Sequence, residues 1–298
     1  MSENMVIIDT DIGDDIDDAF AIALAAAMPE INLVGITTVF CNTVKRAQQV
    51  KELLSACGKD IPVFAGEGKP YMKPYHPVGE YSDEDIMKGT PCQWSEDYAK
   101  YKIEDGAVDF LIEQAEKYGK KLTIVPIGPL TNIARAIEKA PQSMKKISKI
   151  VLMGGYFSKT DPEWNILVDP KAAEIVFNSG IELYVVGLDV TLQCTLKEDL
   201  LKDFRNSSKA VNKVLTLWLD RWFKRYGLGK SVMHDPLAIA SLNGDVCVFE
   251  KKFVKVLLEG KRGTTLVSDK KEEGFSPVFV AVSVNSEKFY SLVRQYLL

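Results

Sequence analysis

The 298-residue chain lacks the features that mark several large classes of protein. No apolar run approaches the ~20 residues that a membrane-spanning helix needs. The five cysteines are scattered, with no Cys-x-x-Cys spacing for zinc and no disulfide-dense pattern, so we expect reduced thiols. Residues 1–4 lead directly into an apolar segment, which leaves no room for a signal peptide. Together these absences predict a soluble, cytoplasmic protein.

The chain also lacks a charge excess and the usual phosphate-binding motifs. Its formal net charge is −4, its pI is near 5.5, and no basic tail or block stands out, which indicates no nucleic-acid partner. Neither Gly-x-Gly-x-x-Gly nor Gly-x4-Gly-Lys-Ser/Thr occurs, which speaks against nucleotide di- and triphosphates as ligands.

What the sequence does contain is an alternation of apolar strands and amphipathic helices. Strands are predicted at 6–9, 31–39, 62–65, 122–127, 149–153 and 182–186, and helices at 43–57, 105–118, 131–139 and 170–178. Continuous apolar strands separated by helices are typical of a parallel sheet covered on both faces. We therefore predict an α/β fold with a mainly parallel, doubly wound, Rossmann-like sheet.

The C-terminal part departs from this alternation. Residues 253–258, 264–267 and 278–284 are predicted as strands of an antiparallel extension, and 286–297 as a last helix. No Gly/Ser-rich linker divides the chain, so we expect a single domain over 1–298. Within it, 196–243 is predicted to be a helical insertion. Residues 66–103, rich in proline and aromatics, are interpreted as an irregular loop or flap over the site.

The most informative segment is an acidic turn. Residues 9–18 hold six aspartates at a predicted strand-to-helix junction, and Gly13 permits a sharp turn between them. A helix N-terminus favours an exposed negative charge by only ~0.3–1 kcal/mol, which does not offset so much mutual repulsion. An all-oxygen set suits Ca²⁺ or Mg²⁺. The alternative is N-capping by Asp14 or Asp15 with the remaining acid solvated.

Polar residues follow the other predicted strands at the same edge of the sheet, where open parallel sheets bind their ligands. They are Asp11, Asn42, Thr131, Glu163, Asn165 and Asp189, with Asp235 entering from the helical part. A set of Asp, Asn, Thr and Glu with few basic residues favours a neutral polyhydroxyl ligand together with a hard cation.

At this point the sequence resembles the nucleoside hydrolases of the inosine–uridine-preferring type. The motifs that carry the resemblance are Asp9-Thr10-Asp11-Ile12-Gly13, Asp17-Asp18-Ala19, Phe40-Cys41-Asn42, Gly128-Pro129-Leu130-Thr131-Asn132, Glu163-Trp164-Asn165 and His234-Asp235-Pro236-Leu237-Ala238. They occur in the family's order from about residue 5 to the C-terminus.

The resemblance implies Ca²⁺-dependent hydrolysis of the N-glycosidic bond of ribonucleosides, giving free base and ribose for salvage. The resemblance also implies which residues form the site. Ca²⁺ would be bound by Asp11, Asp18, the Thr131 carbonyl and Asp235. The ribose would be contacted by Asp17, Asn42, Glu163 and Asn165. In this scheme Asp11 is the general base toward a water on the cation, and His234 protonates the departing base. A homodimer or homotetramer is also implied.

Several positions differ from the family's pattern. Ile12 replaces a proline, and Asp14-Asp15-Ile16 make the turn two residues longer, so that Asp14 or Asp15 could take over a role of Asp17 or Asp18. Cys41 stands where the family usually has glycine. The loop before Glu163 lacks an additional ribose-binding asparagine.

Structural roles compete with several of these functional assignments. Asn42 and Thr131 could cap helices, Glu163 and Asn165 could be ordinary loop residues, and His234 with Asp235 could form an N-cap pair. Asp9 is interpreted as a supporting hydrogen-bond partner.

The aromatic residues and the overall function leave alternatives as well. Trp222 and Tyr226 are expected to pack in the core, and stacking on a nucleobase is the alternative. Two competing functions are a haloacid-dehalogenase-like Mg²⁺ phosphatase, because Asp9-Thr10-Asp11 follows a strand, and a non-catalytic Ca²⁺-dependent nucleoside or ribose sensor.

Overall fold

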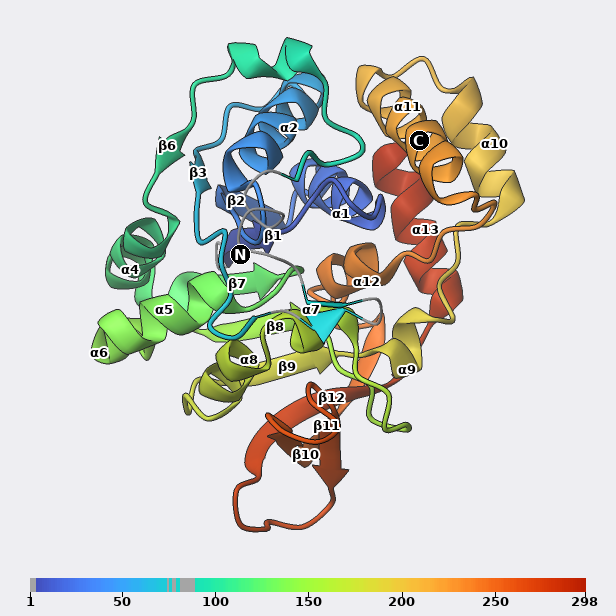
Figure 1. The fold of residues 1–298 in the computed structure, drawn as a ribbon. Helices are drawn as coiled ribbons and strands as arrows, with labels where there is room; N and C mark the ends of the chain where they lie inside the picture. Colours follow the sequence, from blue (N-terminus) through green and yellow to red (C-terminus); the bar gives the residue numbers. More distant parts are fainter. Residues whose placement is uncertain (1–3, 74, 77–78, 81–88) are drawn as a thin grey trace.

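The core of the structure is one large sheet (Figure 1). A computed structural model describes residues 4–73, 75–76, 79–80 and 89–298. The strands of the sheet are β1 (Asn4–Thr10), β2 (Ile31–Thr38), β3 (Val63–Ala65), β6 (Glu104–Asp105), β7 (Leu122–Pro126), β8 (Lys149–Met153), β9 (Leu183–Val186), β10 (Cys247–Val256), β11 (Thr265–Ser268) and β12 (Ser276–Val284). A separate two-stranded ribbon pairs β4 (Tyr75–His76) with β5 (Gly79–Glu80).

The ten strands lie in the order β11-β10-β12-β9-β8-β7-β1-β2-β3-β6. All neighbours from β12 to β6 pair in parallel, whereas β10 is antiparallel to both β11 and β12. The predicted fold class is therefore confirmed, including the antiparallel C-terminal extension. Strand β12 joins the parallel part directly through β9.

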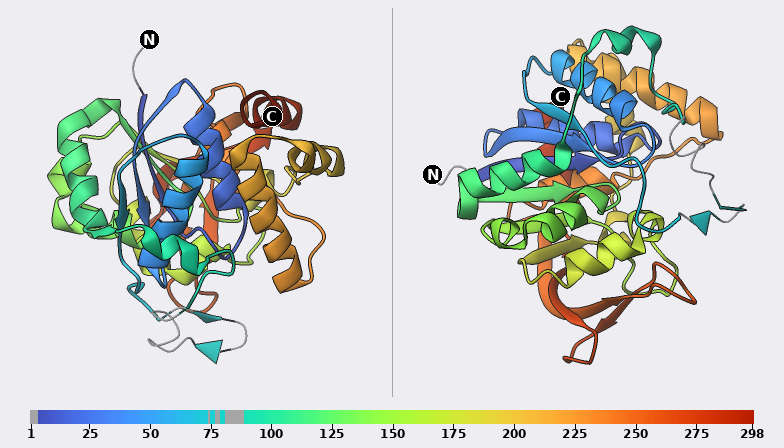
Figure 2. Two further views of the ribbon diagram at one scale, coloured as in Figure 1. Left: turned by 90° about the horizontal axis from the view of Figure 1, so that it is seen from above. Right: turned by 60° about the vertical axis from the view of Figure 1, so that its left-hand side comes forward.

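Helices cover both faces of this sheet (Figures 1 and 2). They are α1 (Asp17–Ala27), α2 (Thr43–Ala56), α4 (Ala107–Tyr118), α5 (Thr131–Lys139), α6 (Pro141–Met144), α7 (Trp164–Val168), α8 (Pro170–Phe177), α9 (Leu188–Thr191), α10 (Glu198–Asn206), α11 (Ala210–Tyr226), α12 (His234–Ala240) and α13 (Ser286–Leu297). Short 3-10 helices occupy Glu96–Lys100 and Gly119–Lys121.

Strand β1 shows how the sheet separates two hydrophobic cores. Its side chains alternate between the faces. Val6 and Ile8 pack in the core that contains α1, α2, α11, α12 and α13. Met5 and Ile7 pack in the core beneath α4, α5 and α8. Because both faces are covered, the strand is continuously apolar from Met5 to Ile8 rather than alternating.

The order of connections locates the place where a ligand would bind. From β1 the chain proceeds to β2, β3 and β6 on one side, then returns to β7 on the other side of β1 and continues to β8 and β9. The direction of winding thus reverses between β1 and β7. In open α/β sheets, the crevice beyond the carboxyl ends of the strands at such a switch point is the ligand site.

The sequence predicted two segments outside the alternation of strands and helices, a loop and a helical insertion. Of the loop predicted at 66–103, residues 74, 77–78 and 81–88 lie outside the described residues. The segment predicted as a helical insertion, 196–243, contains α10, α11 and α12. Among the described residues, no helix combines the length and apolar character needed to cross a membrane.

Gly35 in β2 offers a test of how tightly the sheet and α4 are packed. A Cβ at this position would lie 2.3 Å from the ring of Phe110, which is itself stacked on Phe64 at 4.5 Å. We expect Gly35→Ala to lower the free energy of unfolding by ~1–3 kcal/mol through overpacking, measured by urea denaturation. Gly244→Ala is the control, because nothing lies within 4 Å of its Cβ position. Equal stabilities for the two variants would contradict the packing described here.

Candidate active site

A cavity of about 760 Å³ opens at the carboxyl edge of the sheet near β1, β7 and β8. The charged and polar residues in its wall come from separate segments of the chain: Asp11, Asp14, Asp15, Asp17, Asp18, Thr90, Glu163, Asn165, Arg225, His234 and Asp235. Sequence-distant candidates therefore converge on one space, as the strand-end rule predicts.

The acidic turn forms one wall of this cavity. Strand β1 ends at Thr10, helix α1 begins at Asp17, and the turn between them depends on Gly13, whose φ is +120°. A side chain there would be strained, and its Cβ would lie 2.4 Å from Pro91. Glycine thus allows both the turn and the close approach of the loop that contains Pro91.

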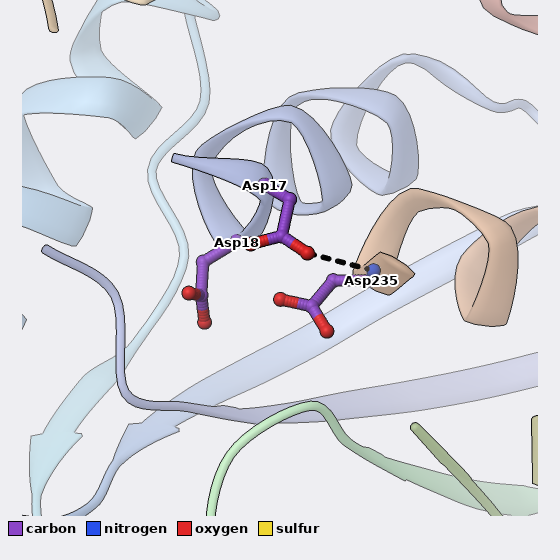
Figure 3. Close-up of side chains that lie close together, drawn as sticks. All are labelled: Asp17, Asp18 and Asp235. Carbon is purple, nitrogen blue, oxygen red and sulfur yellow. Dashed lines mark hydrogen bonds between the residues drawn. The ribbon is translucent and has the colours of Figure 1, made fainter. Parts of the chain in front are cut away.

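Three carboxylates form the most compact acidic group among the described residues (Figure 3). Oxygens of Asp17, Asp18 and Asp235 lie within 4.8 Å of one another, and all three residues are buried. The Asp235 backbone N–H donates to Asp17 at 3.2 Å, and the Thr10 hydroxyl donates to Asp18 at 2.5 Å. The start of α12 is thereby held against the start of α1.

The electrostatics of this group fit a bound cation. Burial, followed by repulsion from neighbouring carboxylates, raises the pKa of Asp17, Asp18 and Asp235 well above the ordinary value. Burial also raises the pKa of nearby Asp11 to about 7, against the opposing charge of Arg46. Ionised carboxylates in such a place need a compensating positive charge. Because every donor is an oxygen, a hard cation such as Ca²⁺ or Mg²⁺ fits this acidic cluster.

The two additional residues of the turn lie apart from the cluster. Asp14 forms an ion pair with Arg46 at 2.5 Å, and its side chain is 48% exposed. Asp15 is exposed, and its carboxylate accepts the backbone N–H of Ile16. Both line the cavity, but neither belongs to the compact group formed by Asp17 and Asp18 with α12.

Asp9 lies in β1 behind the turn and is fully buried. One of its oxygens accepts both the Thr37 hydroxyl at 2.6 Å and the Asn132 amide at 2.7 Å. Asn132 also donates to the Thr38 carbonyl. Asp9 thus links β1 and β2 to the start of α5, which agrees with the supporting role expected from the sequence.

Asn42 and Thr131 make contacts of the structural kind. The Asn42 side chain caps α2 by accepting the Lys45 N–H at 3.1 Å. Thr131 begins α5 and is buried, and its hydroxyl donates to Asp169 at 2.7 Å. Neither residue is among those that line the cavity in the described structure. Their roles toward ribose and cation stay predictions.

Glu163 and Asn165 are buried in the wall of the cavity, in the segment after β8. Glu163 caps α7 by accepting the backbone N–H groups of Asn165 and Ile166, and it accepts that of Gly155 as well. The Asn165 amide donates to the carbonyl oxygens of Ile127 at 3.0 Å and Met153 at 3.2 Å. Asn165 therefore joins the ends of β7 and β8, while both side chains face the cavity.

His234 lies beside Asp235 at the start of α12. Its Nδ1 is 2.7 Å from the Thr191 hydroxyl, and its ring lines the cavity. Burial lowers the pKa of His234 to about 4, so the imidazole is neutral near pH 7. The helix N-cap is Met233, with no side-chain capping hydrogen bond, so the structure does not show the simple N-cap pair that was the alternative.

Aromatic and aliphatic side chains form the outer part of the cavity. Trp222 of α11 is 6% exposed and Tyr226 is 50% exposed, and both line the cavity with Trp164 and Leu228. The expectation of core packing holds for Trp222, whereas Tyr226 stands at the rim. An apolar, aromatic surface of this kind is suited to the face of a nucleobase.

Two features next to the site were not anticipated. Arg46 of α2 is 1% exposed and bonds to the acidic turn. Phe40 and Cys41, which line the cavity after β2, have φ values of +65° and +58°. Non-glycine residues in such conformations cost of order 1–3 kcal/mol each. The presence of Cys41 in place of the family's usual glycine was the only signal in the sequence.

Comparison with known proteins identifies the family of this chain. The sequence profile of the family described as "Inosine-uridine preferring nucleoside hydrolase" matches residues 6–291. The chain belongs to this nucleoside hydrolase family. It is 32% identical to "Uridine nucleosidase 1" from Arabidopsis thaliana, over 98% of this chain and 93% of that protein. It is thus an enzyme of the N-glycosidase type.

Solved structures of nucleoside hydrolases share the fold. The "Plant nucleoside hydrolase - PpNRh1 enzyme" superposes with a TM-score of 0.82 at 29% identity, covering 99% of both chains. The "Purine-Preferring Ribonucleoside Hydrolase from Gardnerella vaginalis" superposes with a TM-score of 0.78 at 31% identity, covering 98% of both chains. The resemblance stated from the motifs is confirmed, and the phosphatase alternative finds no support.

The acidic cluster of this nucleoside hydrolase leads to a test by pH. Because its pKa is raised in the folded state, Asp18 keeps its proton there while the unfolded chain releases it. Chelator-treated wild type should therefore lose stability relative to Asp18→Asn as pH rises above about 4, the ordinary pKa of an aspartate in the unfolded chain. Urea denaturation in EDTA at pH 5 and 7.5 measures this difference.

A hard cation held by the cluster would stabilise wild type more than the variant, which lacks one ionised carboxylate, so the expected result of adding Ca²⁺ is the reverse order. A variant less stable than wild type at pH 7.5 in EDTA would contradict the electrostatic strain assigned to the cluster.

Proposed function

We propose that this nucleoside hydrolase cleaves the N-glycosidic bond of ribonucleosides in a Ca²⁺-dependent reaction that gives free base and ribose. The observation that supports it best is the buried group of Asp17, Asp18 and Asp235 at the bottom of a cavity whose rim is aromatic. A hard cation and a sugar both suit the polar end, and a base suits the apolar end.

In this proposal Asp11, Asp18, Asp235 and the Thr131 carbonyl hold the cation. Asp11 and Asp18 both line the cavity, and after burial the charge of Asp11 is a further cause of the raised pKa of Asp18. An oxygen of Asp17 lies within 4.8 Å of oxygens of both Asp18 and Asp235, so in this proposal Asp17 contacts the cation or a ribose hydroxyl beside it. Bound Ca²⁺ would supply a Lewis acid that lowers the pKa of a water in contact with it.

The remaining steps are assigned to side chains of the cavity. Asp11 accepts the proton of the attacking water as general base. Buried Glu163 and Asn165, with Asn42, orient the ribose, and the carboxylates stabilise positive charge that develops on the sugar ring as the bond breaks. The resemblance implied that His234 protonates the departing base. Because burial lowers its pKa to about 4, His234 is neutral near pH 7, and in this proposal it donates a hydrogen bond to the base while Thr191 holds its ring.

The preferred base does not follow from the relatives. One is named a uridine nucleosidase and another a purine-preferring hydrolase, at nearly the same identity to this chain. The half-exposed ring of Tyr226 at the rim suits any flat aromatic ring by stacking and so does not select one base. We also propose one domain over 1–298, because one sheet runs through it, and a homodimer or homotetramer, which only the resemblance supports.

Ribose release tests the proposed activity. Purified protein incubated with purine and pyrimidine ribonucleosides should release ribose, and chelator should abolish the release until Ca²⁺ is restored. Asp11→Asn should lower kcat by about 100-fold or more, because general-base catalysis contributes that much. Asp245→Asn, at an exposed carboxylate away from the cavity, is the matched control and should retain activity. Phosphate release from sugar phosphates without ribose release from any nucleoside would refute the proposal.

The aromatic rim gives a second test of the same proposal. Tyr226→Ala should raise KM for ribonucleosides by about 5-fold or more through loss of one stacking surface, with a smaller change in kcat, since base–aromatic stacking contributes ~1–3 kcal/mol. Tyr118→Ala, on the far α4, controls for loss of an aromatic residue. An unchanged KM for every nucleoside would remove Tyr226 from base recognition.

A further inference from the structure

Arg46 lies outside the cavity and yet contacts the chain segments that form its wall. It is the only lysine or arginine among the described residues that is buried, with 1% of its surface exposed. Its Nη2 donates to the Asp14 carboxylate at 2.5 Å, its Nη1 to the carbonyls of Asp11 and Ile12, the latter at 2.8 Å, and its Nε to the Phe40 carbonyl at 2.7 Å.

These bonds connect two turns that follow neighbouring strands. Asp11, Ile12 and Asp14 belong to the acidic turn after β1, and Phe40 belongs to the turn after β2, which pairs with β1. A guanidinium presents its N–H groups in a fixed planar fork, so one side chain can fix both turns at once. The ammonium group of a lysine is a compact point donor and cannot span them in the same way.

The turn after β2 needs such support. Phe40 and Cys41 are held in left-handed backbone conformations, and both side chains line the cavity. Their backbone N–H groups donate to the carbonyls of Glu67 at 2.8 Å and Gly68 at 2.9 Å. The Cys41 carbonyl accepts the Thr43 N–H at 3.1 Å, and Arg46 donates to the Phe40 carbonyl, which places this short segment against the acidic turn.

We propose that Arg46 is a positioning residue for the hydrolysis. By holding the backbone at Asp11 and Ile12 in a fixed relation to Phe40, it directs the Asp11 side chain toward the cation and the substrate without touching either. The proposal rests on the proposed function. It also gives Asp14 a place in the site, because Asp14 is the carboxylate partner of Arg46 rather than a member of the acidic cluster.

Arg46→Lys tests the proposal, because it keeps the charge and removes the fork. Isothermal titration calorimetry with CaCl₂ should show a Kd for Ca²⁺ about 10-fold or more above that of wild type, at unchanged stoichiometry. Steady-state ribose release should show kcat lowered by about 10- to 100-fold with little change in KM. Arg205→Lys is the matched control, since the ion pair of Arg205 with Asp220 is exposed, and both readouts should match wild type.

The stoichiometry separates positioning from a general loss of folded protein. If Arg46→Lys lowers the stoichiometry and leaves Kd unchanged, Arg46 serves stability alone and the proposal is overturned. An unchanged Kd and kcat in a fully folded variant would overturn it equally. If wild type releases no ribose but binds Ca²⁺, the proposed function fails, and the comparison of Kd values still decides the role of Arg46. Absence of Ca²⁺ binding by wild type would overturn both.

Arg46→Lys is also tested in a protein that carries Cys41→Gly, in case Arg46→Lys alone does not fold. Cys41→Gly removes the cost of the left-handed conformation at that position. Cys41→Gly/Arg46→Lys is compared with Cys41→Gly alone, so that any effect of residue 41 on the cavity is present in both proteins. A rise in the Kd for Ca²⁺ of about 10-fold between the two supports the proposal, and equal Kd values contradict it.

Discussion

The burial of several carboxylates at one point of the sheet is the constraint on which the rest of the site depends. Asp11, Asp17, Asp18 and Asp235 are all buried, and they come from the ends of β1, α1 and α12. Without a cation these groups destabilise the fold when they ionise. Buried carboxylates in such number indicate a binding site rather than a contribution to stability. The surrounding contacts hold these mutually repelling groups in place.

The fold supplies those contacts from both sides of the switch point. Gly128, at the end of β7, lies so near Asp11 that a Cβ would be 2.8 Å from its backbone nitrogen. On the other side of β1, the Thr37 hydroxyl of β2 donates to Asp9, which also accepts the Asn132 amide of α5. Arg46 adds positive charge and hydrogen-bond donors from α2. The acidic turn is therefore enclosed by backbone and by neutral or cationic donors, which leaves its carboxylates directed to the cavity.

The fold could be predicted from the sequence because strands buried on both faces are recorded as continuous apolar runs. The first and last residues of individual strands and helices were harder to predict. Strand β10 begins at Cys247, several residues before the predicted 253, because the charged residues Glu250, Lys251 and Lys252 interrupt the apolar pattern. Helix α4 begins at Ala107 rather than 105, because Gly106 adopts a φ of +108° just before it.

The convergence of residues at the strand ends was likewise predictable, whereas the burial of Arg46 and its contacts with the acidic turn were not. An arginine on a helix is usually exposed, and the partners of Arg46 are mostly backbone carbonyls, which leave no trace in a sequence. Asn42 shows the opposite difficulty, since the same residue type suits a cap and a sugar contact. Sequence indicated which side chains gather at the edge of the sheet, but the packing beneath them required the structure.

The positions of Asp14 and Asp15 follow from the fixed ends of the acidic turn. Asp11 is fixed by β1, while Asp17 and Asp18 are fixed by α1, whose residues are nearly all buried. Two additional residues between these fixed ends can only extend outward. Asp14 and Asp15 do so, and the extension is held by Arg46 and by the Gln93 side chain, which donates to the Asp15 carbonyl at 2.6 Å. Asp14 and Asp15 thus lie at the rim of the cavity, whereas Asp17 and Asp18 lie in the buried acidic cluster.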